Sequence, residues 1–217
     1  MHLCFQTILR VIASGSLLVA LTACQGVREP DAPQPPLLSQ SEASALIEDN
    51  IEKAWQSVSM LYPEAVRPDV DVVRIVDQNE WAPTVVRCMQ ENGFNSTVSR
   101  DGGVESGSIP SGQLSAYEVQ YFACTAAYPL NPKYRVPFNE EQIEYLYWYY
   151  SNPLRSCLLT EGYDVIDPPS EARFLETFGT ADEWYPYQSL RGLSEDAWYS
   201  ISEKCPEVPE LIYGETD

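Results

Sequence analysis

The sequence contains a single histidine, His2, which lies in an N-terminal segment that we expect to be removed. The mature chain then has no imidazole to act as a general base, to activate a serine or cysteine, or to bind zinc. This absence excludes Ser-His-Asp and Cys-His nucleophile systems and histidine-ligated metal centres. An enzyme made from this chain would have to use carboxylates, tyrosines, lysines or an oxygen-ligated metal.

Positive charge is also scarce. From residue 24 onward the chain has 12 Lys or Arg against 32 Asp or Glu, an excess of 20 negative charges. Such a surface repels nucleic acid and anionic lipid, so we expect no nucleic-acid partner. It attracts cations and basic peptides, although acidity is most often a matter of solubility. The acids show no calcium-loop spacing, and we expect neither a bound metal nor a cofactor.

No apolar run near the N-terminus is long enough to span a membrane. The run VIASGSLLVALTA, residues 11–23, has 13 residues without an ionisable side chain, whereas a spanning helix needs about 20. It follows MHLCFQTILR, in which Arg10 is the only firm positive charge. A short basic start followed by a short apolar run is the layout of a secretion signal, so we expect residues 1–23 to be a signal peptide.

The expected cleavage site lies in the stretch Leu21-Thr22-Ala23-Cys24, which resembles the lipobox of bacterial lipoproteins. The resemblance implies that Cys24 receives a diacylglyceryl group and becomes the first residue of the mature chain. It also implies a location on the extracytoplasmic face of the cell membrane, with the membrane as a partner through the lipid. Each buried methylene contributes about 0.8 kcal/mol, so two or more acyl chains give a stable anchor. The alternative is ordinary secretion, with cleavage near Ala23.

The segment after the lipobox is rich in proline. Residues 24–40 include Pro30, Pro33, Pro35 and Pro36 and have little that could pack. Proline favours an extended backbone of about 3.1 Å per residue, so this segment could reach roughly 50 Å if fully extended. We interpret residues 24–40 as the lipidated cysteine and its tether; the alternative is a simple disordered terminus.

With Cys4 in the signal and Cys24 lipidated, an even number of cysteines remains in an oxidising location. They are Cys88, Cys124, Cys157 and Cys205. Four cysteines allow three pairings, and spacing alone does not choose among them. We favour Cys88 with Cys124 and Cys157 with Cys205, because each bond then closes one half of the chain. A zinc site is the weaker alternative, since no two of these cysteines are close in sequence.

The remaining residues, 41–217, predict one extracytoplasmic α+β domain that is rich in helix. Apolar residues recur at helical spacing in several segments, and Asn139 with Gln142 has the spacing of a capping box. Pro153 should interrupt the helix that begins there. The expected helices are 41–62, 80–94, 114–128, 139–160, 170–178 and 194–205, and the expected strands are 70–76, 94–99 and 164–166.

The two halves of this domain echo each other. Residues 88–94, CMQENGF, have the same spacing of Cys, Gly and aromatic residue as residues 157–163, CLLTEGY. A helix that ends in a left-handed glycine explains the pattern, because the residue after the glycine packs on the residue five positions earlier. Duplication and independent origin both remain open. The order of these features resembles uncharacterised lipoproteins of high-GC Gram-positive bacteria, a resemblance that implies no particular activity.

Aromatic residues are concentrated around residue 147. On a helical wheel Tyr145, Trp148 and Tyr149 lie opposite a second apolar face, and Trp184 could join them. A helix that is apolar on both sides is either central to the core or presents an aromatic surface. Flat amphipathic rings suit sugars and peptides. These four residues are therefore candidate ligand-binding residues, and burial is the alternative.

The sequence contains no signature of catalysis, and we identify no catalytic residue. The main hypothesis is a membrane-anchored, non-catalytic module that binds an envelope ligand or protein. The alternative is a carboxylate-dependent glycan hydrolase, which needs two carboxyls about 5 to 9.5 Å apart in unlike environments. Acids such as Glu140, Glu141 and Glu144 could serve, but with 32 acids accidental pairs are expected. A purely structural spacer is a third class.

Overall fold

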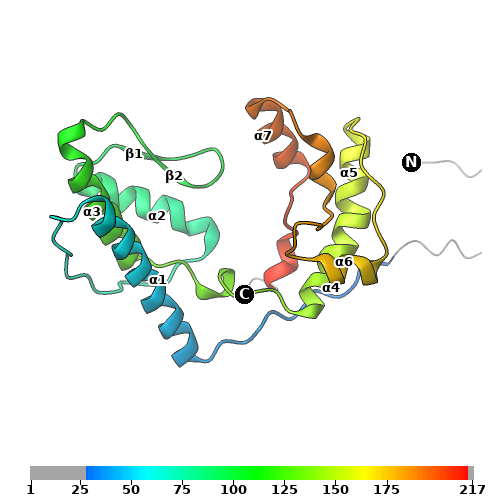
Figure 1. Ribbon diagram of the computed structural model, residues 1–217, viewed down its shortest axis with the longest axis horizontal. Helices are drawn as coiled ribbons and strands as arrows, with labels where there is room; N and C mark the ends of the chain where they lie inside the picture. Colours follow the sequence, from blue (N-terminus) through cyan, green and yellow to red (C-terminus); the bar gives the residue numbers. More distant parts are fainter. Residues whose placement is uncertain (1–27, 215–217) are drawn as a thin grey trace, which may run out of the picture.

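The computed structural model describes residues 28–214 and shows a helix-rich α+β protein with one small β-hairpin. The helices form two lobes (Figure 1). We call residues 40–127 the N-terminal lobe and residues 138–213 the C-terminal lobe. The signal peptide and the lipobox, including Cys24, lie outside the described residues.

The N-terminal lobe is built on three helices, α1 (Gln40–Leu61), α2 (Gln78–Glu91) and α3 (Leu114–Ala127). A capping box between Ser39 and Glu42 begins α1 by satisfying two backbone N–H groups that have no partner within the helix. The apolar stripe of α1 packs on α3, where Val58 lies against Phe122. A short 3-10 turn, Ser111–Gln113, leads into α3.

The hairpin consists of β1 (Ser96–Val98) and β2 (Val104–Ser106), paired antiparallel with Thr97 opposite Glu105. β1 confirms the strand expected within residues 94–99. β2 lies in the glycine-rich segment that the sequence analysis left without a strand, because only three of its residues pair. The hairpin packs on α2 and extends toward α7 of the other lobe (Figure 1).

Two expected strands were wrong. Residues 70–76 and residues 164–166 belong to no strand. The first segment instead follows the end of α3: the Val73 N–H donates to Ala127 at 2.8 Å, and Val76 forms a single parallel bridge with Leu130. Its β-branched residues favour a strand, but no neighbouring segment supplies a ladder of hydrogen bonds.

The C-terminal lobe begins with α4 (Glu140–Tyr149), capped by Asn139 and Gln142 as predicted. Gln142 is almost fully buried and also donates to the Ile212 carbonyl at 2.8 Å, so it joins α4 to the end of the chain. The remaining helical segments are the π-helical turn Tyr150–Leu154, α5 (Arg155–Thr160), α6 (Glu171–Thr177), the 3-10 turn Pro186–Leu190, α7 (Glu195–Lys204) and the 3-10 turn Glu210–Tyr213. A 3-10 turn, Pro132–Tyr134, lies between the lobes.

Pro153 interrupts the regular helix as the sequence predicts. It lies within the π-helical turn that separates α4 from α5. Proline has no N–H to donate and its ring crowds the preceding turn, so a wider turn accommodates it without ending the helix. The side-chain amide of Asn152 donates to the Trp148 carbonyl at 2.9 Å.

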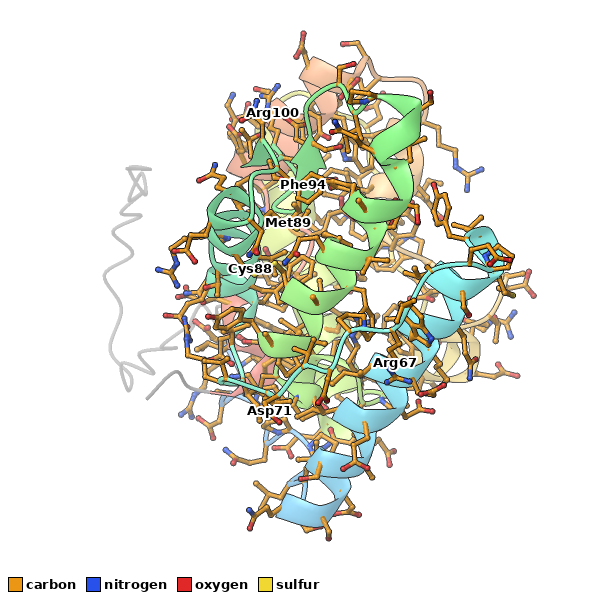
Figure 2. The ribbon with its side chains drawn as sticks, turned by 90° about the vertical axis from the view of Figure 1, so that its left-hand side faces the viewer. Arg67, Asp71, Cys88, Met89, Phe94 and Arg100 are labelled. Carbon is orange, nitrogen blue, oxygen red and sulfur yellow. A yellow bond between two sulfur atoms is a disulfide. The ribbon has the colours of Figure 1, made fainter. Side chains whose placement is uncertain are left out.

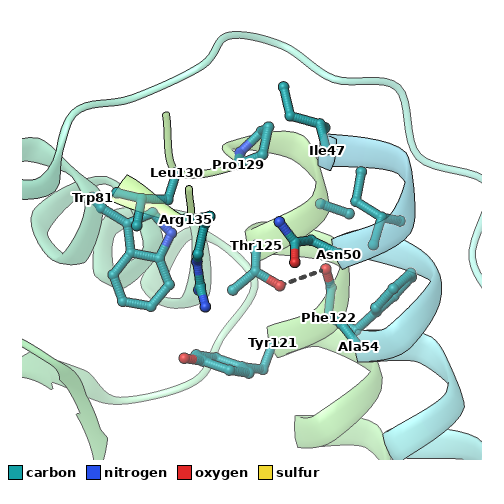
Figure 3. A pocket seen from close by; sticks show the side chains of 12 residues that line it. Ile47, Asn50, Ala54, Trp81, Tyr121, Phe122, Thr125, Pro129, Leu130 and Arg135 are labelled. Atoms are coloured by element: carbon teal, nitrogen blue, oxygen red, sulfur yellow. Dashed lines mark hydrogen bonds between the residues drawn. The ribbon is translucent and has the colours of Figure 1, made fainter. Parts of the chain in front are cut away.

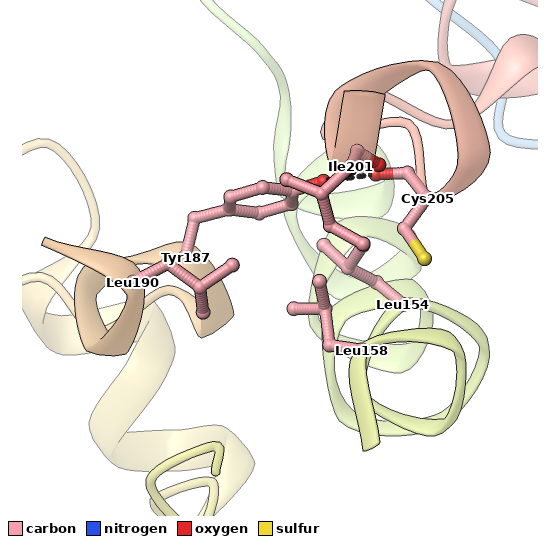
Figure 4. Close-up of a cluster of buried hydrophobic side chains, with 6 residues drawn as sticks. All are labelled: Leu154, Leu158, Tyr187, Leu190, Ile201 and Cys205. Atoms are coloured by element: carbon pink, nitrogen blue, oxygen red, sulfur yellow. Dashed lines mark hydrogen bonds between the residues drawn. The ribbon is translucent and has the colours of Figure 1, made fainter. Parts of the chain in front are cut away.

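Tyr187 lies at the centre of one C-terminal core cluster (Figure 4). Its ring is 1% exposed, among Leu154, Leu158 and Ile201. Its hydroxyl donates to the Cys205 carbonyl at 2.5 Å and to the Ile201 carbonyl at 3.2 Å. The Ile201 carbonyl also accepts the Cys205 N–H at 2.8 Å, so the buried tyrosine mainly satisfies the carbonyl of Cys205, which follows the last residue of α7.

Both predicted disulfides are present, Cys88–Cys124 and Cys157–Cys205. The two predicted helix ends are confirmed as well. The Phe94 N–H donates to the Met89 carbonyl at 3.0 Å, and Tyr163 forms the same bond, also 3.0 Å, with Leu158. Phe94 packs in the cluster that contains Met89 (Figure 2). Each half therefore has a helix end fixed by glycine and a disulfide.

Residues 28–39, expected as part of the tether, lie against the C-terminal lobe. Pro33 is buried, and the Gln34 carbonyl accepts a hydrogen bond of 2.8 Å from Asn139. The chain then crosses to α1 in the other lobe (Figure 1). A second connection is Arg100, next to the hairpin, whose guanidinium lies 4.7 Å from the Tyr199 ring of α7.

Candidate functional site

The sequence left two interpretations of the aromatic residues around α4, and the structure buries two of the four candidates. Tyr145 is 5% exposed and Trp184 is 7% exposed. Both belong to a core cluster with Phe174, where Phe174 and Trp184 make an edge-to-face contact with ring centroids 6.4 Å apart. Their rings stabilise the C-terminal lobe and leave little surface for a ligand.

Trp148 and Tyr149 are only partly buried. The Tyr149 hydroxyl donates to the Pro206 carbonyl at 2.7 Å, so its polar end is already used. The Trp148 indole N–H is buried and has no hydrogen-bond acceptor among the described residues. Trp148 lines two surface depressions. Trp148 and Tyr149 thus both keep some exposed surface. Because the indole N–H is buried, the exposed part of Trp148 is apolar.

One of these depressions brings acids next to the aromatic helix. Its lining includes Asp31, Glu141, Glu144 and Glu171 beside Trp148. All four acidic residues are exposed, whereas a general acid for glycan hydrolysis needs an apolar setting that keeps it protonated. The depression therefore holds several carboxylates in similar surroundings, and the unlike pair that this chemistry requires is not evident there.

Glu207 has the contrasting environment. Partial burial raises the pKa of its carboxyl above the ordinary value. Its charge acts on Tyr150 and Tyr187, and together with burial it helps raise the pKa of Tyr187 to about 12. Glu207 does not line the depression that holds the four exposed acids.

The described part of the chain contains no group of three or more His, Cys, Asp or Glu placed to hold a metal ion. Between residues 28 and 214 no helix combines the length and apolarity that a membrane crossing requires. Comparison of the chain with protein-family models, curated proteins and solved structures found no match.

A cavity in the N-terminal lobe offers a different site (Figure 3). Its volume is about 270 Å³, close to the lower limit of about 300 to 1,000 Å³ that is usual for small-molecule sites. It lies between α1, the start of α2, α3 and the chain that leads to the other lobe. Its lining residues are Ile47, Asn50, Ile51, Ala54, Trp81, Tyr121, Phe122, Thr125, Ala126, Pro129, Leu130 and Arg135. We call this cavity the α1–α3 pocket.

Side-chain size explains why the pocket exists. Large rings fill the space between the helices at one level, where Trp55 and Phe122 meet edge to face at 5.1 Å. Nearby, the small residues Ala54, Thr125 and Ala126 occupy the wall, and they leave space that their side chains do not reach. The Thr125 hydroxyl donates to the Phe122 carbonyl of its own helix at 3.0 Å, so the methyl group is its main contribution to the pocket.

A few polar groups enter this apolar space. Asn50 reaches in from α1, and Arg135 reaches in from the opposite wall (Figure 3). Tyr121 lies below them, and burial is the main cause that raises the pKa of its hydroxyl, which therefore stays a neutral hydrogen-bond donor. The side chains of Asn50, Tyr121 and Arg135 form no hydrogen bond or ion pair with any described residue. An apolar cavity with a few free polar groups is the usual form of a ligand site.

The α1–α3 pocket was not predicted from the sequence. One signal was present: Asn50 interrupts the apolar stripe of α1, between Ile47 and Ala54 at helical spacing. A polar residue on a core-facing stripe indicates either a satisfied buried group or a lined cavity. Arg135 gave no such signal, because its place depends on how residues 128–139 cross from one lobe to the other.

Proposed function

We propose that this chain is a lipid-anchored extracytoplasmic module that binds a small ligand without changing it chemically. The signal layout and the lipobox of residues 21–24 support the anchor. The α1–α3 pocket supports binding, and it is the observation that carries this proposal. Its lining combines apolar walls with three polar side chains that have no hydrogen-bond partner among the described residues, and it includes no carboxylate. An acid-dependent reaction would have no group to perform it there.

The anchor is tested by metabolic labelling with an alkynyl fatty acid, followed by membrane fractionation. We expect the wild-type chain to be labelled and to remain with the membrane, and the Cys24→Ala variant to carry no label. Cys4→Ala is the matched control and should be labelled normally, because residue 4 leaves with the signal. Labelling of the Cys24→Ala variant, or an unlabelled wild type, would contradict the anchor.

Binding is tested with the mature chain from residue 25 onward, using N-phenylnaphthylamine, a neutral dye that fluoresces in apolar sites. We expect saturable binding to the wild type. Thr125→Phe should weaken it about tenfold, because the added ring occupies the pocket and about 1.4 kcal/mol corresponds to a factor of ten. Thr97→Phe is the control, since it adds the same ring at an exposed position. Equal binding to wild type and Thr125→Phe would place the dye elsewhere and refute the proposal.

The glycan-hydrolase alternative has less support. It would require Glu207 and one of the exposed acids near Trp148 to act on one substrate, and Glu207 does not line the depression that holds those acids. Glu207→Gln provides the test: loss of a measured glycan-hydrolase activity in this variant would favour the alternative.

A further inference from the structure

The distribution of ion pairs distinguishes one residue of the α1–α3 pocket from most other cations. Twelve Lys and Arg residues follow the lipobox, and eight of them form ion pairs with acids. This is expected where acids outnumber cations by 32 to 12. Within the described residues, the cations without an ion pair are Arg28, Arg87, Arg135 and Arg191.

Arg135 is the member of this group that lines the α1–α3 pocket. It follows the 3-10 turn Pro132–Tyr134, so its backbone position is fixed by a turn that Asn131 caps. A guanidinium stays charged at any pH relevant to the cell, and its donors match the oxygen atoms of an anion. Neighbouring Lys133 is held 3.5 Å from Asp77, so Arg135 is the free positive charge at this site.

The rest of the pocket limits what such an anion could be attached to. Trp81, Phe122 and Leu130 provide apolar surface for a ring or a short chain. Asn50 and Tyr121 add neutral hydrogen-bond donors near Arg135 (Figure 3). A single arginine suits a single negative charge, because a second charge on the ligand would meet the excess of 20 negative charges on the chain. The volume of about 270 Å³ excludes a whole phospholipid or a folded peptide.

We infer that the α1–α3 pocket binds an apolar molecule with one anionic group, with its apolar body between α1 and α3 and its anion on Arg135. This inference deepens the proposed function and rests on it. It assigns Arg135 the role of selecting charged ligands over neutral ligands of the same shape. Asn50 and Tyr121 complete the polar end of the site.

Two dyes with the same ring system distinguish the contribution of Arg135 from that of the apolar walls. Anilinonaphthalene sulfonate is N-phenylnaphthylamine with one added sulfonate, so the ratio of their dissociation constants reports the anionic group alone. We expect Arg135→Met to lower the preference for the sulfonate dye about fivefold, because Arg135 is exposed and an exposed ion pair contributes up to about 1 kcal/mol. Binding of the neutral dye should not change, which also shows that the variant is folded.

Arg87→Met is the matched control. Arg87 is exposed, forms no ion pair with a described residue and lies outside the pocket lining, so this variant has the same change in net charge. It should keep the wild-type preference for the sulfonate dye. If Arg135→Met and Arg87→Met had the same preference for the sulfonate dye over the neutral dye, Arg135 would not be the residue that binds the anion. The proposed function would still stand in that case if both dyes bound. If the wild type bound neither dye, the proposed function itself would fail.

Competition then identifies the apolar body. Decanoate and N-acetylphenylalanine each carry one carboxylate, on a chain and on a ring respectively. Displacement of the sulfonate dye by either compound, and not by decanol, supports the inference and selects the class. If decanol competes as well as decanoate, or if neither carboxylate competes, the inference is wrong.

Discussion

Gly93 ends α2 with a backbone φ of +86°, and its replacement by alanine should destabilise the protein by about 1 kcal/mol. The left-handed conformation costs an L-residue roughly 1 to 2 kcal/mol. Alanine also lowers the conformational entropy of the unfolded chain, which offsets about 0.4 to 1 kcal/mol of this cost. A Cβ added at Gly93 meets nothing within 4 Å, so no steric cost is added.

The prediction has a close parallel and a control in the same chain. Gly162 ends α5 with a φ of +90° and equally open surroundings, so Gly162→Ala should cost about the same. Gly112 has equally open surroundings but is not among the glycines with positive φ. Gly112→Ala should therefore be neutral or stabilising by up to about 1 kcal/mol.

The assay is urea unfolding followed by tryptophan fluorescence. With a slope of about 2 kcal/mol per molar urea, Gly93→Ala should lower the midpoint by about 0.5 M without changing the slope. If Gly93→Ala and Gly112→Ala behaved alike, the left-handed helix end would be refuted, and with it the bond from Phe94 to Met89. A loss above about 3 kcal/mol would also refute the reasoning, because the backbone alone does not supply it.

Three further predictions concern the C-terminal lobe and its contact with the hairpin. Tyr187→Phe should destabilise the protein by about 1 to 3 kcal/mol in urea unfolding, because it leaves the buried carbonyl of Cys205 without the hydroxyl donor; an unchanged midpoint would contradict this. Burial raises the pKa of Glu207, so its contribution to stability is present below the ordinary value of 4.5 and is lost as pH rises through the folded pKa. Glu207→Gln should therefore be more stable than the wild type at neutral pH, with the difference shrinking toward pH 4.5; a difference independent of pH would refute the assignment. Arg100→Met should cost at most about 1 kcal/mol, because the contact with Asp196 is exposed, yet amide exchange of the hairpin should accelerate; unchanged exchange would show that Arg100 does not hold the hairpin on α7.

Local patterns in the sequence predicted most of the helices. The capping box of Asn139 and Gln142, the interruption at Pro153 and both glycine-ended helices depend on residues within one or two turns of each other. The disulfide pairing followed from a simple assumption, that each bond closes one half. These features could be predicted because the physical causes lie close together in the chain.

Features that depend on distant segments were not predicted. Residues 70–76 have strand-like composition, but a strand needs a partner, and the sequence gives no sign that the neighbour is the end of α3. The faces of α4 posed the same problem. From the sequence alone, the ring of Tyr145 could lie on a binding surface or in the core. Phe174 and Trp184, which come from later segments of the chain, pack with it in one core cluster and bury it.

The candidate site shows the same limit more strongly. Its residues come from α1, α2, α3 and the connection between the lobes, and Asn50 was the only residue with a local signal. Arg135 becomes a candidate ligand-binding residue only because of two facts together. It lines a cavity, and it lacks the ion pair that most cations of this acidic chain form. Neither fact can be derived from spacing along the sequence.

The most direct test of a ligand site between α1 and α3 is a crystal structure of the mature chain with anilinonaphthalene sulfonate. We expect the naphthalene ring in the α1–α3 pocket, with the sulfonate within hydrogen-bond distance of Arg135. Dye bound in the depressions beside Trp148 with an empty α1–α3 pocket would contradict the proposed site and would favour a site at the aromatic residues of α4.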